Sequence, residues 1–385
     1  MRAAIYEAGA GKWRIVYDAP PGPDGRRKQK SVTVRGTKKD AQRKRTEILH
    51  QLQTGSYVDP ARTTVREYLE RWLQEYVVPN LAAKTAQEYA RMIRKYVIPC
   101  VGAVRLTELT PLRLVSFYNK MQREGSLRGN GGLSAQTVVH LHRVLHKALQ
   151  QAVKWQILIR NPADAAQPPK CQRIEMRVLP DDQVSKLLIA AEGTTLYMPV
   201  LLAISTGMRR GEVLALKWQD VDMDAGFLSV RRSLEQTRAG LSFKSPKNSK
   251  SKRTVVMPAN LARALVKHKG IQAQNKLLLG EGYQDLGMVC CYPDGRPVNP
   301  NYLTSAFPGL LQRAGLPHIR FHDLRHTHAT MLLAQGVHPK IVSERLGHCT
   351  IGITLDTYSH VLPSMQEEAA RKIDGILDAA FAEGE

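Results

Sequence analysis

The sequence predicts a mainly α-helical protein with small β-sheets (an α+β fold) that is divided into three domains. Apolar residues recur at helical spacing through residues 63–160 and again beyond residue 175. Alternating patterns typical of half-buried strands occupy residues 12–20 and 28–37, and a short β region is expected over 226–257. The stretches "GSYVDPARTT" and "NPADAAQPPKCQR" have the composition of linkers. The expected domains are therefore 1–60, 63–165 and 175–385.

The charge of the chain favours a polyanionic partner. Its formal net charge is +22 with a pI near 9.9, and the basic residues cluster in particular segments. No stretch approaches the roughly 18 apolar residues of a spanning helix, and "MRAAIYEAGAGKW" lacks the apolar core of a signal peptide. We therefore expect a cytoplasmic protein with no membrane partner. Five scattered cysteines without a CxxC pair disfavour a zinc site and disulfides.

The first segment predicts a basic hairpin followed by a helix. "KWRIVYDAP" and "KQKSVTVRGT" are the strands, and "PGPDGRR" is the turn. The helix "TKKDAQRKRTEILHQLQTG" has Thr37 as its N-cap and Gly55 as its stop. Lys and Arg outnumber Asp and Glu by 13 to 6 over residues 1–60. Because a two-stranded ribbon fits the major groove, DNA contact is favoured over a merely solvated surface, and the expected contacts are Arg14, Arg26, Arg27, Lys28 and Lys30.

The second segment predicts a compact helical domain. "TVREYLERWLQEYV" places Val65, Tyr68, Leu69, Trp72 and Tyr76 on one stripe. "TAQEYARMIRKYVI" continues this pattern, and "SAQTVVHLHRVLHKALQQAVKWQ" is a long amphipathic helix that opens with a serine. Most of the aromatic residues are therefore expected in a core and not as platforms for stacked bases.

Two basic motifs mark the third segment. In "STGMRRGEVLALKWQDVD", Arg209 stands where a helix can begin and Glu212 lies on the same face, although a surface ion pair would give the same pattern. "SFKSPKNSKSKRTVVMP" is a basic loop that leads into an apolar strand. We expect a turn that is held rigidly against a sheet and presents a lysine, with DNA contacts from Lys244, Lys250, Lys252 and Arg253.

The stretch "HDLRHTHATMLLAQGVHPKIVSERLGHCTIGITLDTYSH" holds six of the 12 histidines. It predicts a helix ending at Gly336 and a second helix from Pro339 to Gly347. His348 is then expected to be exposed at the turn, with Tyr358 ten residues later. The buried side of the first helix is expected to comprise Leu324, His328, Met331 and Leu332.

Three kinds of site compete for these histidines: a metal site, a structural helix pair and a phosphate-handling site. His322 and His326 have the i, i+4 spacing of zinc helices, but no glutamate lies between them and Arg325 would project a cation toward the metal. Arginines bind phosphate oxygens bidentately, histidines donate hydrogen bonds and a lysine can protonate a leaving oxygen. Nearby cations would lower the pKa of an attacking tyrosine from its ordinary value of about 10. The phosphate-handling site is therefore favoured.

Together and in order, "TGMRRGE…LKW", "SPKNSKSKRTV", "HDLRHTHAT" and "LGHCTIGITLDTYSHV" resemble the tyrosine recombinases, the phage-type integrase family of phages and conjugative transposons. The first two segments resemble the arm-binding domain and the SAM-like core-binding domain of such integrases. The sequence departs from the family pattern at Asn248, Cys349 and Gly352, where threonine, serine and a polar helix former are common. None of these departures removes a catalytic group.

The resemblance implies a site-specific DNA recombinase that integrates or excises a mobile element through a 3′-phosphotyrosyl intermediate. It implies no cofactor and no metal. The expected partners are double-stranded DNA at core and arm sites, three further copies of the chain in a tetramer on DNA, and directionality or DNA-bending factors, in the nucleoid of a bacterial host. A type IB topoisomerase-like enzyme and a DNA-binding regulator without catalysis are the alternatives. The implied residues are the nucleophile Tyr358, the clamping Arg209 and Arg325, the general acid Lys247, the histidines His322 and His348, and the supporting Glu212.

Overall fold

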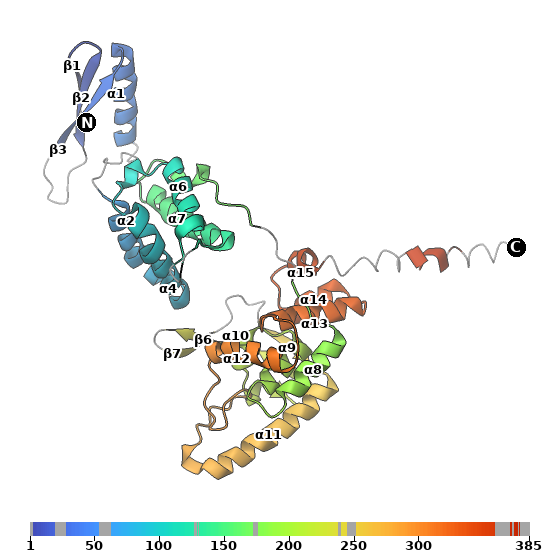
Figure 1. The fold of residues 1–385 in the computed structure, drawn as a ribbon. Helices are drawn as coiled ribbons and strands as arrows, with labels where there is room; N and C mark the ends of the chain where they lie inside the picture. The colour runs from blue at the N-terminus through green and yellow to red at the C-terminus, as the bar shows by residue number, and fades with distance from the viewer. Residues whose placement is uncertain are drawn as a thin grey trace. The chain divides into compact units, whose positions relative to one another are not determined.

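The computed structural model describes residues 3–19, 28–53, 63–126, 129, 131–171, 176–237, 240–244, 252–358, 370–371, 373–375 and 377. The fold is mostly helical with small antiparallel sheets, which confirms the predicted class (Figure 1). The chain divides into two compact units, Met1–Arg173 and Ile174–Glu385. Within the described ranges, no helix combines the length and apolar character needed to span a membrane.

The first 53 residues form a three-stranded antiparallel sheet in the order β1-β2-β3, followed by one helix. Ile15, Tyr17 and Ile48 form the small core between sheet and helix. Thr37 caps the helix as predicted, because its hydroxyl accepts from the Asp40 amide and the Asp40 carboxylate accepts in return. The sequence interpretation missed the first strand, and its predicted turn lies outside the described residues. The elements are β1 (Ala3–Glu7), β2 (Lys12–Ala19), β3 (Lys28–Arg35) and α1 (Lys38–Gln53).

A second core within the first unit is entirely helical. The predicted stripe is confirmed, since Val65, Tyr68, Leu69 and Trp72 are almost fully buried, and Ser134 caps the long helix as predicted. Each of two wider π-helical turns ends shortly before a proline, which cannot donate the usual helical hydrogen bond. The elements are α2 (Val65–Trp72), η1 (Leu73–Val77), α3 (Val78–Asn80), α4 (Ala83–Met92), η2 (Ile93–Val97), α5 (Ile98–Val101), η3 (Leu106–Glu108), α6 (Pro111–Glu124), α7 (Ala135–Lys154) and η4 (Pro162–Ala165).

The start of the second predicted linker is part of this helical core. The Asn161 side chain accepts from the Ala163 amide at 3.0 Å and donates to the His146 carbonyl at 3.2 Å. Asp164 pairs with the His146 ring at 2.8 Å, and Ala163 and Ala166 are buried. The linker prediction was therefore wrong for these residues, because they form a capped turn that packs on α7.

The second unit is built around α9 (Tyr197–Thr206), an apolar helix most of whose residues are buried. The expected β region consists of two sheets, β4-β5-β8 and the hairpin β6-β7. The strands on either side of the basic loop therefore belong to different sheets. The loop itself, residues 245–251, lies outside the described residues, so the expected turn stays a prediction. The elements are α8 (Asp181–Ala191), α9 (Tyr197–Thr206), α10 (Arg210–Leu214), η5 (Trp218–Asp220), β4 (Val221–Asp222), β5 (Phe227–Val230), β6 (Ser233–Thr237), β7 (Gly240–Lys244), β8 (Arg253–Val256), α11 (Ala259–Leu279), η7 (Gly280–Gly282) and α12 (Pro300–Arg313).

Three helices complete the second unit: α13 (Asp323–Ala334), α14 (Pro339–Leu346) and α15 (Ile351–Tyr358). Helix α13 packs against α9, and Leu324 and His328 on its inner side are buried as predicted. Leu333 is the buried residue of the next turn, whereas Met331 and Leu332 are only partly buried. Gly347 ends α14 with a φ of +67°, so the predicted stop is confirmed.

Candidate active site

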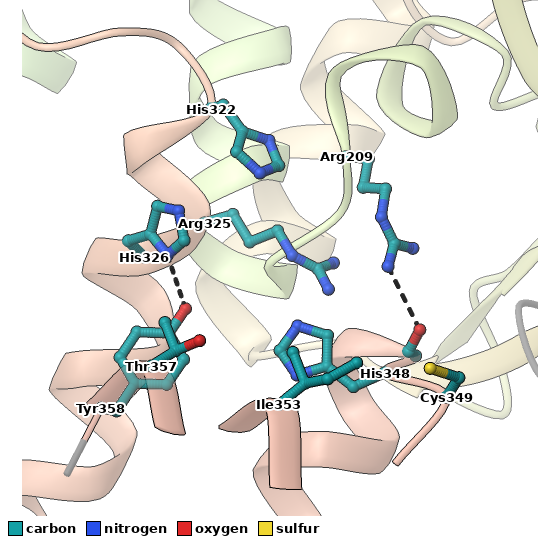
Figure 2. A pocket seen from close by; sticks show the side chains of 10 residues that line it. Arg209, His322, Arg325, His326, His348, Cys349, Ile353, Thr357 and Tyr358 are labelled. Atoms are coloured by element: carbon teal, nitrogen blue, oxygen red, sulfur yellow. Dashed lines mark hydrogen bonds between the residues drawn. The ribbon is translucent and has the colours of Figure 1, made fainter. Parts of the chain in front are cut away.

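Residues from four parts of the second unit converge on a pocket of about 330 Å³. The parts are the turn between α9 and α10, helix α13, the turn after α14, and helix α15 (Figure 2). Five of the seven residues expected to form the site line the pocket directly. The full lining is Arg209, His322, Arg325, His326, Gly347, His348, Cys349, Ile353, Thr357 and Tyr358.

Two glycines with left-handed backbone bring the arginines together. Gly207 ends α9 with a φ of +66°, and an added Cβ there would lie 2.6 Å from Leu346, so only glycine fits. Its carbonyl accepts a hydrogen bond from Arg325 Nη1 at 2.7 Å. The Gly347 carbonyl accepts from Arg209 Nη2 at 3.2 Å. Each arginine therefore donates a hydrogen bond to a glycine turn that lies far from it in the sequence.

Glu212 forms an ion pair with Arg209, as the sequence pattern of the two residues indicates. Its carboxylate accepts from Arg209 Nη1 at 2.9 Å and from the Arg209 amide at 3.0 Å. Arg253 Nη2 donates at 2.9 Å to Oε2, the oxygen that also accepts from the Arg209 amide, and the Arg253 side chain is only 7% exposed. Burial alone would raise the pKa of Glu212, but the two arginines and the backbone hydrogen bond bring it below its ordinary value.

Glu212→Gln should therefore lower the free energy of unfolding by about 3 kcal/mol at pH 7, because buried Arg253 loses its counter-charge. A lowered pKa in the folded state stabilises the protein above the ordinary value of 4.5, and this stabilisation is lost as the pH falls through the folded value. The difference between variant and parent should thus shrink below about pH 4.5. Urea unfolding from pH 3 to 8 measures it, with the exposed Glu344→Gln as control. A constant difference across this range would contradict the ion-pair assignment.

Arg325 has an unpartnered nitrogen in the pocket. The residue is 3% exposed, and its Nη2 has no hydrogen-bond partner among the described residues. Burial, together with the nearby charges of Arg209 and Arg253, lowers the pKa of the guanidinium to about 9, which leaves it charged at neutral pH. A buried cation with an open donor is a binding site for an anion, because an anion supplies both the missing acceptor and the missing counter-charge.

The histidines of the pocket are neutral at neutral pH. Burial, and then Arg325, lower the pKa of His322 and bring that of His348 to about 4. His348 Nδ1 lies 2.8 Å from the Thr354 hydroxyl, and the side chain is half-buried. The expectation of an exposed His348 is corrected, because α15 folds back over the turn that carries it.

Tyr358 is 1% exposed, and its hydroxyl lies 2.7 Å from His326 Nδ1. Burial raises the pKa of the phenol to about 12, and Arg325 offsets only part of this rise. The sequence interpretation expected nearby cations to lower this pKa, and for this DNA-free pocket that expectation was wrong. The loss of hydration outweighs the attraction of the arginine.

The expected DNA contacts have different outcomes. Arg14 is exposed and donates to Ser31 Oγ at 3.2 Å, and Lys252 is exposed. Lys244 pairs with Glu235. The Arg253 side chain is largely buried and its Nε donates to the Arg345 carbonyl at 2.7 Å, while its contact with DNA stays a prediction. The catalytic candidate Lys247 lies outside the described residues with Lys250, Arg26 and Arg27, as do the side chains of Lys28 and Lys30.

His326 is the pocket residue whose role the sequence interpretation missed. It was weighed only as a metal ligand beside His322, and the two rings meet edge-on with centroids 5.3 Å apart. In the described part of the chain, no group of three or more His, Cys, Asp and Glu residues is arranged to hold a metal ion. The i, i+4 spacing was the available signal, because it places both rings on one face of α13.

Comparisons with known proteins agree with this arrangement. The profile of the phage integrase family matches residues 177–365, and that of the phage integrase N-terminal SAM-like domain matches residues 64–122. A XerC-like tyrosine recombinase from Caldanaerobacter subterraneus is 30% identical over 359 residues, which cover 88% of this chain and 90% of that protein. The ICEBs1 integrase of Bacillus subtilis is 29% identical over 248 residues, or 64% and 67% of the two chains.

Solved structures share the fold at lower sequence identity. The Tn1549 transposon integrase in complex with circular intermediate DNA has a TM-score of 0.68 at 19% identity, over 80% of this chain and 99% of that one. A lambda integrase tetramer bound to a Holliday junction has a TM-score of 0.56 at 18% identity, over 90% and 95% of the two chains.

Proposed function

This chain belongs to the phage integrase family of tyrosine recombinases, and on that premise we propose that its pocket binds a scissile DNA phosphate that Tyr358 attacks. The protein is accordingly a tyrosine-type site-specific DNA recombinase. The observation that carries the proposal is the unpartnered Nη2 of Arg325, a residue that lines the same pocket as the tyrosine. Arg209 and Arg325 come from motifs more than 100 residues apart and both line this pocket. Two guanidinium groups in one pocket suit the binding of a phosphate.

In the proposed reaction, the Tyr358 hydroxyl loses its proton to solvent, its oxygen forms a bond to phosphorus, and the bond from phosphorus to the 5′ oxygen breaks. Arg209, Arg325, His322 and His348 stabilise the negative charge that grows on the phosphate oxygens. Lys247 gives a proton to the leaving 5′ oxygen, a role that rests on the family motif. The resulting 3′-phosphotyrosyl bond retains the energy of the phosphodiester, so the 5′ hydroxyl of another strand can attack it and reseal the DNA.

The partners of the proposed reaction are core and arm attachment sites, bound by four copies of the chain. In this proposal the helical domain and the second unit bind the core site, and the N-terminal sheet binds the arm site. A module that binds a second site favours bridging between duplexes, and hence recombination over the relaxation of one duplex by a topoisomerase. Directionality and DNA-bending factors are expected partners of such an assembly.

A nicked suicide duplex tests the function. The duplex is built from the DNA that flanks the gene, since integrase genes often lie beside their attachment sites. Loss of the short strand beyond the cleavage point should trap the covalent complex, visible as a protein–DNA band on a denaturing gel. Digestion to a phosphotyrosine-containing peptide should place the link at Tyr358. A link at another residue would contradict the assignment, as would cleavage without a covalent complex.

Metal removal should leave this reaction intact. Arginines and a lysine supply the positive charge that the proposed mechanism needs, and the neutral histidines supply hydrogen bonds, so cleavage and resealing in excess EDTA should stay within about twofold of the untreated rates. The same gel assay with and without EDTA measures this. Complete loss of activity, restored by zinc, would instead assign a metal to His322 and His326.

The exposed face of the N-terminal sheet should contact arm DNA through phosphates. Lys12, Arg14 and Arg35 are exposed, and the strand register places them on the face opposite α1. Each lost phosphate contact should lower the slope of log affinity against log salt by roughly 0.9. Replacing all three with serine should thus lower the slope by up to about 2.7 for arm DNA and leave core-site cleavage measurable.

Fluorescence anisotropy with arm and core duplexes measures these affinities between 50 and 300 mM salt. The matched control replaces three basic residues of α11, Arg263, Lys267 and Lys276. Equal losses on arm and core duplexes would show that the sheet is not an arm-binding module.

A further inference from the structure

We infer that His326 is the positioning residue of the nucleophile: its Nδ1 accepts a hydrogen bond from the Tyr358 hydroxyl and holds the phenol oxygen at the pocket. This inference rests on the proposed function and deepens it. The family resemblance assigns roles to His322 and His348 and none to His326. The structure, however, places His326 within hydrogen-bond distance of the tyrosine hydroxyl, so it does more than line the pocket.

The contact joins two separate helices. His326 lies on α13 and Tyr358 at the end of α15, 32 residues later in the chain. The distance from Nδ1 to the hydroxyl oxygen is 2.7 Å, and the ring centroids are 5.8 Å apart with the planes at 53° (Figure 2). The short distance and the tilted planes are those of a hydrogen bond between the two side chains and not of stacked rings.

The histidine side of the contact is fixed. The neighbours of His326 on α13 anchor the helix to the rest of the unit: Arg325 donates to the Gly207 carbonyl at 2.7 Å. His328 Nδ1 lies 2.7 Å from the Ile204 carbonyl, and Thr327 accepts from the Leu179 amide at 3.2 Å. These three contacts therefore hold the part of α13 that carries His326.

The tyrosine side is held more lightly. Ile351, Ile353 and Leu355 on α15 remain 38–40% exposed, so much of this helix is not packed. Among the described residues, two side-chain hydrogen bonds join α15 to the neighbouring elements, Thr354 with His348 and Tyr358 with His326. The second lies at the reactive oxygen itself, so it determines where that oxygen stands relative to Arg325.

The protonation states give the hydrogen bond its direction. Burial, and then neighbouring His322, Arg325 and Arg320, lower the pKa of His326 to about 4, although Asp323 acts in the opposite direction. The imidazole is thus neutral at neutral pH, while the pKa of Tyr358 is about 12 and its hydroxyl keeps the proton. The tyrosine is therefore the donor and Nδ1 the acceptor, which places the ring hydrogen on Nε2.

Two substitutions separate positioning from other roles. In His326→Asn, the amide oxygen lies near the place of Nδ1 and still accepts, whereas His326→Leu keeps the bulk and removes the acceptor. With the suicide duplex, the Leu variant should cleave roughly 10- to 100-fold more slowly at saturating DNA, because a misaimed nucleophile costs rate and not affinity. The Asn variant should stay within about fivefold of the parent. His318→Leu and His318→Asn, at an exposed site outside the pocket, are the matched controls.

A cleavage rate equal to that of the parent in His326→Leu would overturn the inference. An equal loss of rate in both variants would also overturn it, because it would show that His326 accepts the tyrosine proton and does not merely position the hydroxyl. A shift in DNA affinity with no change in maximal rate would also overturn it. The parent is the internal reference. If the parent itself forms no covalent complex, the proposed function fails, and the hydrogen bond is judged by spectroscopy alone.

That spectroscopy needs no DNA. Long-range proton–nitrogen NMR correlations of the histidine rings report which nitrogen carries the hydrogen, and the His326 signals are assigned as those lost in His326→Asn. They should show a hydrogen on Nε2 and a free Nδ1 at pH 7, and the Nδ1 resonance should move in Tyr358→Phe. A hydrogen on Nδ1, or a resonance that Tyr358→Phe leaves unchanged, would overturn the inference.

Discussion

Tyr358→Phe should abolish the covalent protein–DNA complex and leave DNA binding intact. The substitution removes a single oxygen, and this oxygen is the proposed nucleophile. No other described side chain of the pocket can replace it as a hydroxyl placed against both Arg325 and His326. The 1%-exposed ring stays packed, so the fold should survive. The free energy of unfolding should fall by about 1–3 kcal/mol, since His326 Nδ1 loses its donor.

Denaturing gels with the suicide duplex measure the covalent complex, and mobility shifts with intact core duplex measure binding. Tyr302→Phe, at a half-exposed tyrosine outside the pocket, is the control and should retain full activity. A covalent band that persists in Tyr358→Phe would refute the assignment of the nucleophile. Loss of binding together with cleavage would show instead that the hydroxyl supports the fold of the pocket.

Arg325→Lys should lower the cleavage rate by roughly two to three orders of magnitude. The arginine uses Nη1 to bind the Gly207 carbonyl, and its buried Nη2 has no partner among the described residues. A lysine ammonium is a single point and cannot occupy both positions, so either the link to the α9–α10 turn or the phosphate contact is lost. Arg209→Lys should act in the same direction, since Arg209 also divides its nitrogens between Glu212 and Gly347.

Single-turnover cleavage at saturating DNA measures this effect. Arg320→Lys is the matched control, because Arg320 lies on the same segment with its side chain 70% exposed and paired with Asp323. Its cleavage rate should remain within about threefold of the parent. A rate within tenfold of the parent for Arg325→Lys would show that charge alone, without the planar fork, suffices in this pocket.

Much of the fold was predictable because its signals are local. Thr37 and Ser134 start helices by accepting hydrogen bonds from amides three residues away, and Gly347 ends one through its own backbone angle. The stripe at Val65–Trp72 follows from helical spacing alone. The first strand was missed because the five residues of β1 alternate only weakly, and their pairing with β2 is a property of the sheet.

The candidate site divides in the same way. Arginine, histidine and tyrosine in ordered motifs determined the class of chemistry, because those side chains have fixed charges and donors whatever surrounds them. Only the tertiary structure decided that Arg253 is buried against Glu212, that His348 is covered by α15, and that His326 meets Tyr358. It also decided the sign of the pKa shift of Tyr358, since the nearby arginine and the loss of water act in opposite directions. Their balance depends on depth and distance between elements far apart in the chain, and no residue pattern contains either quantity.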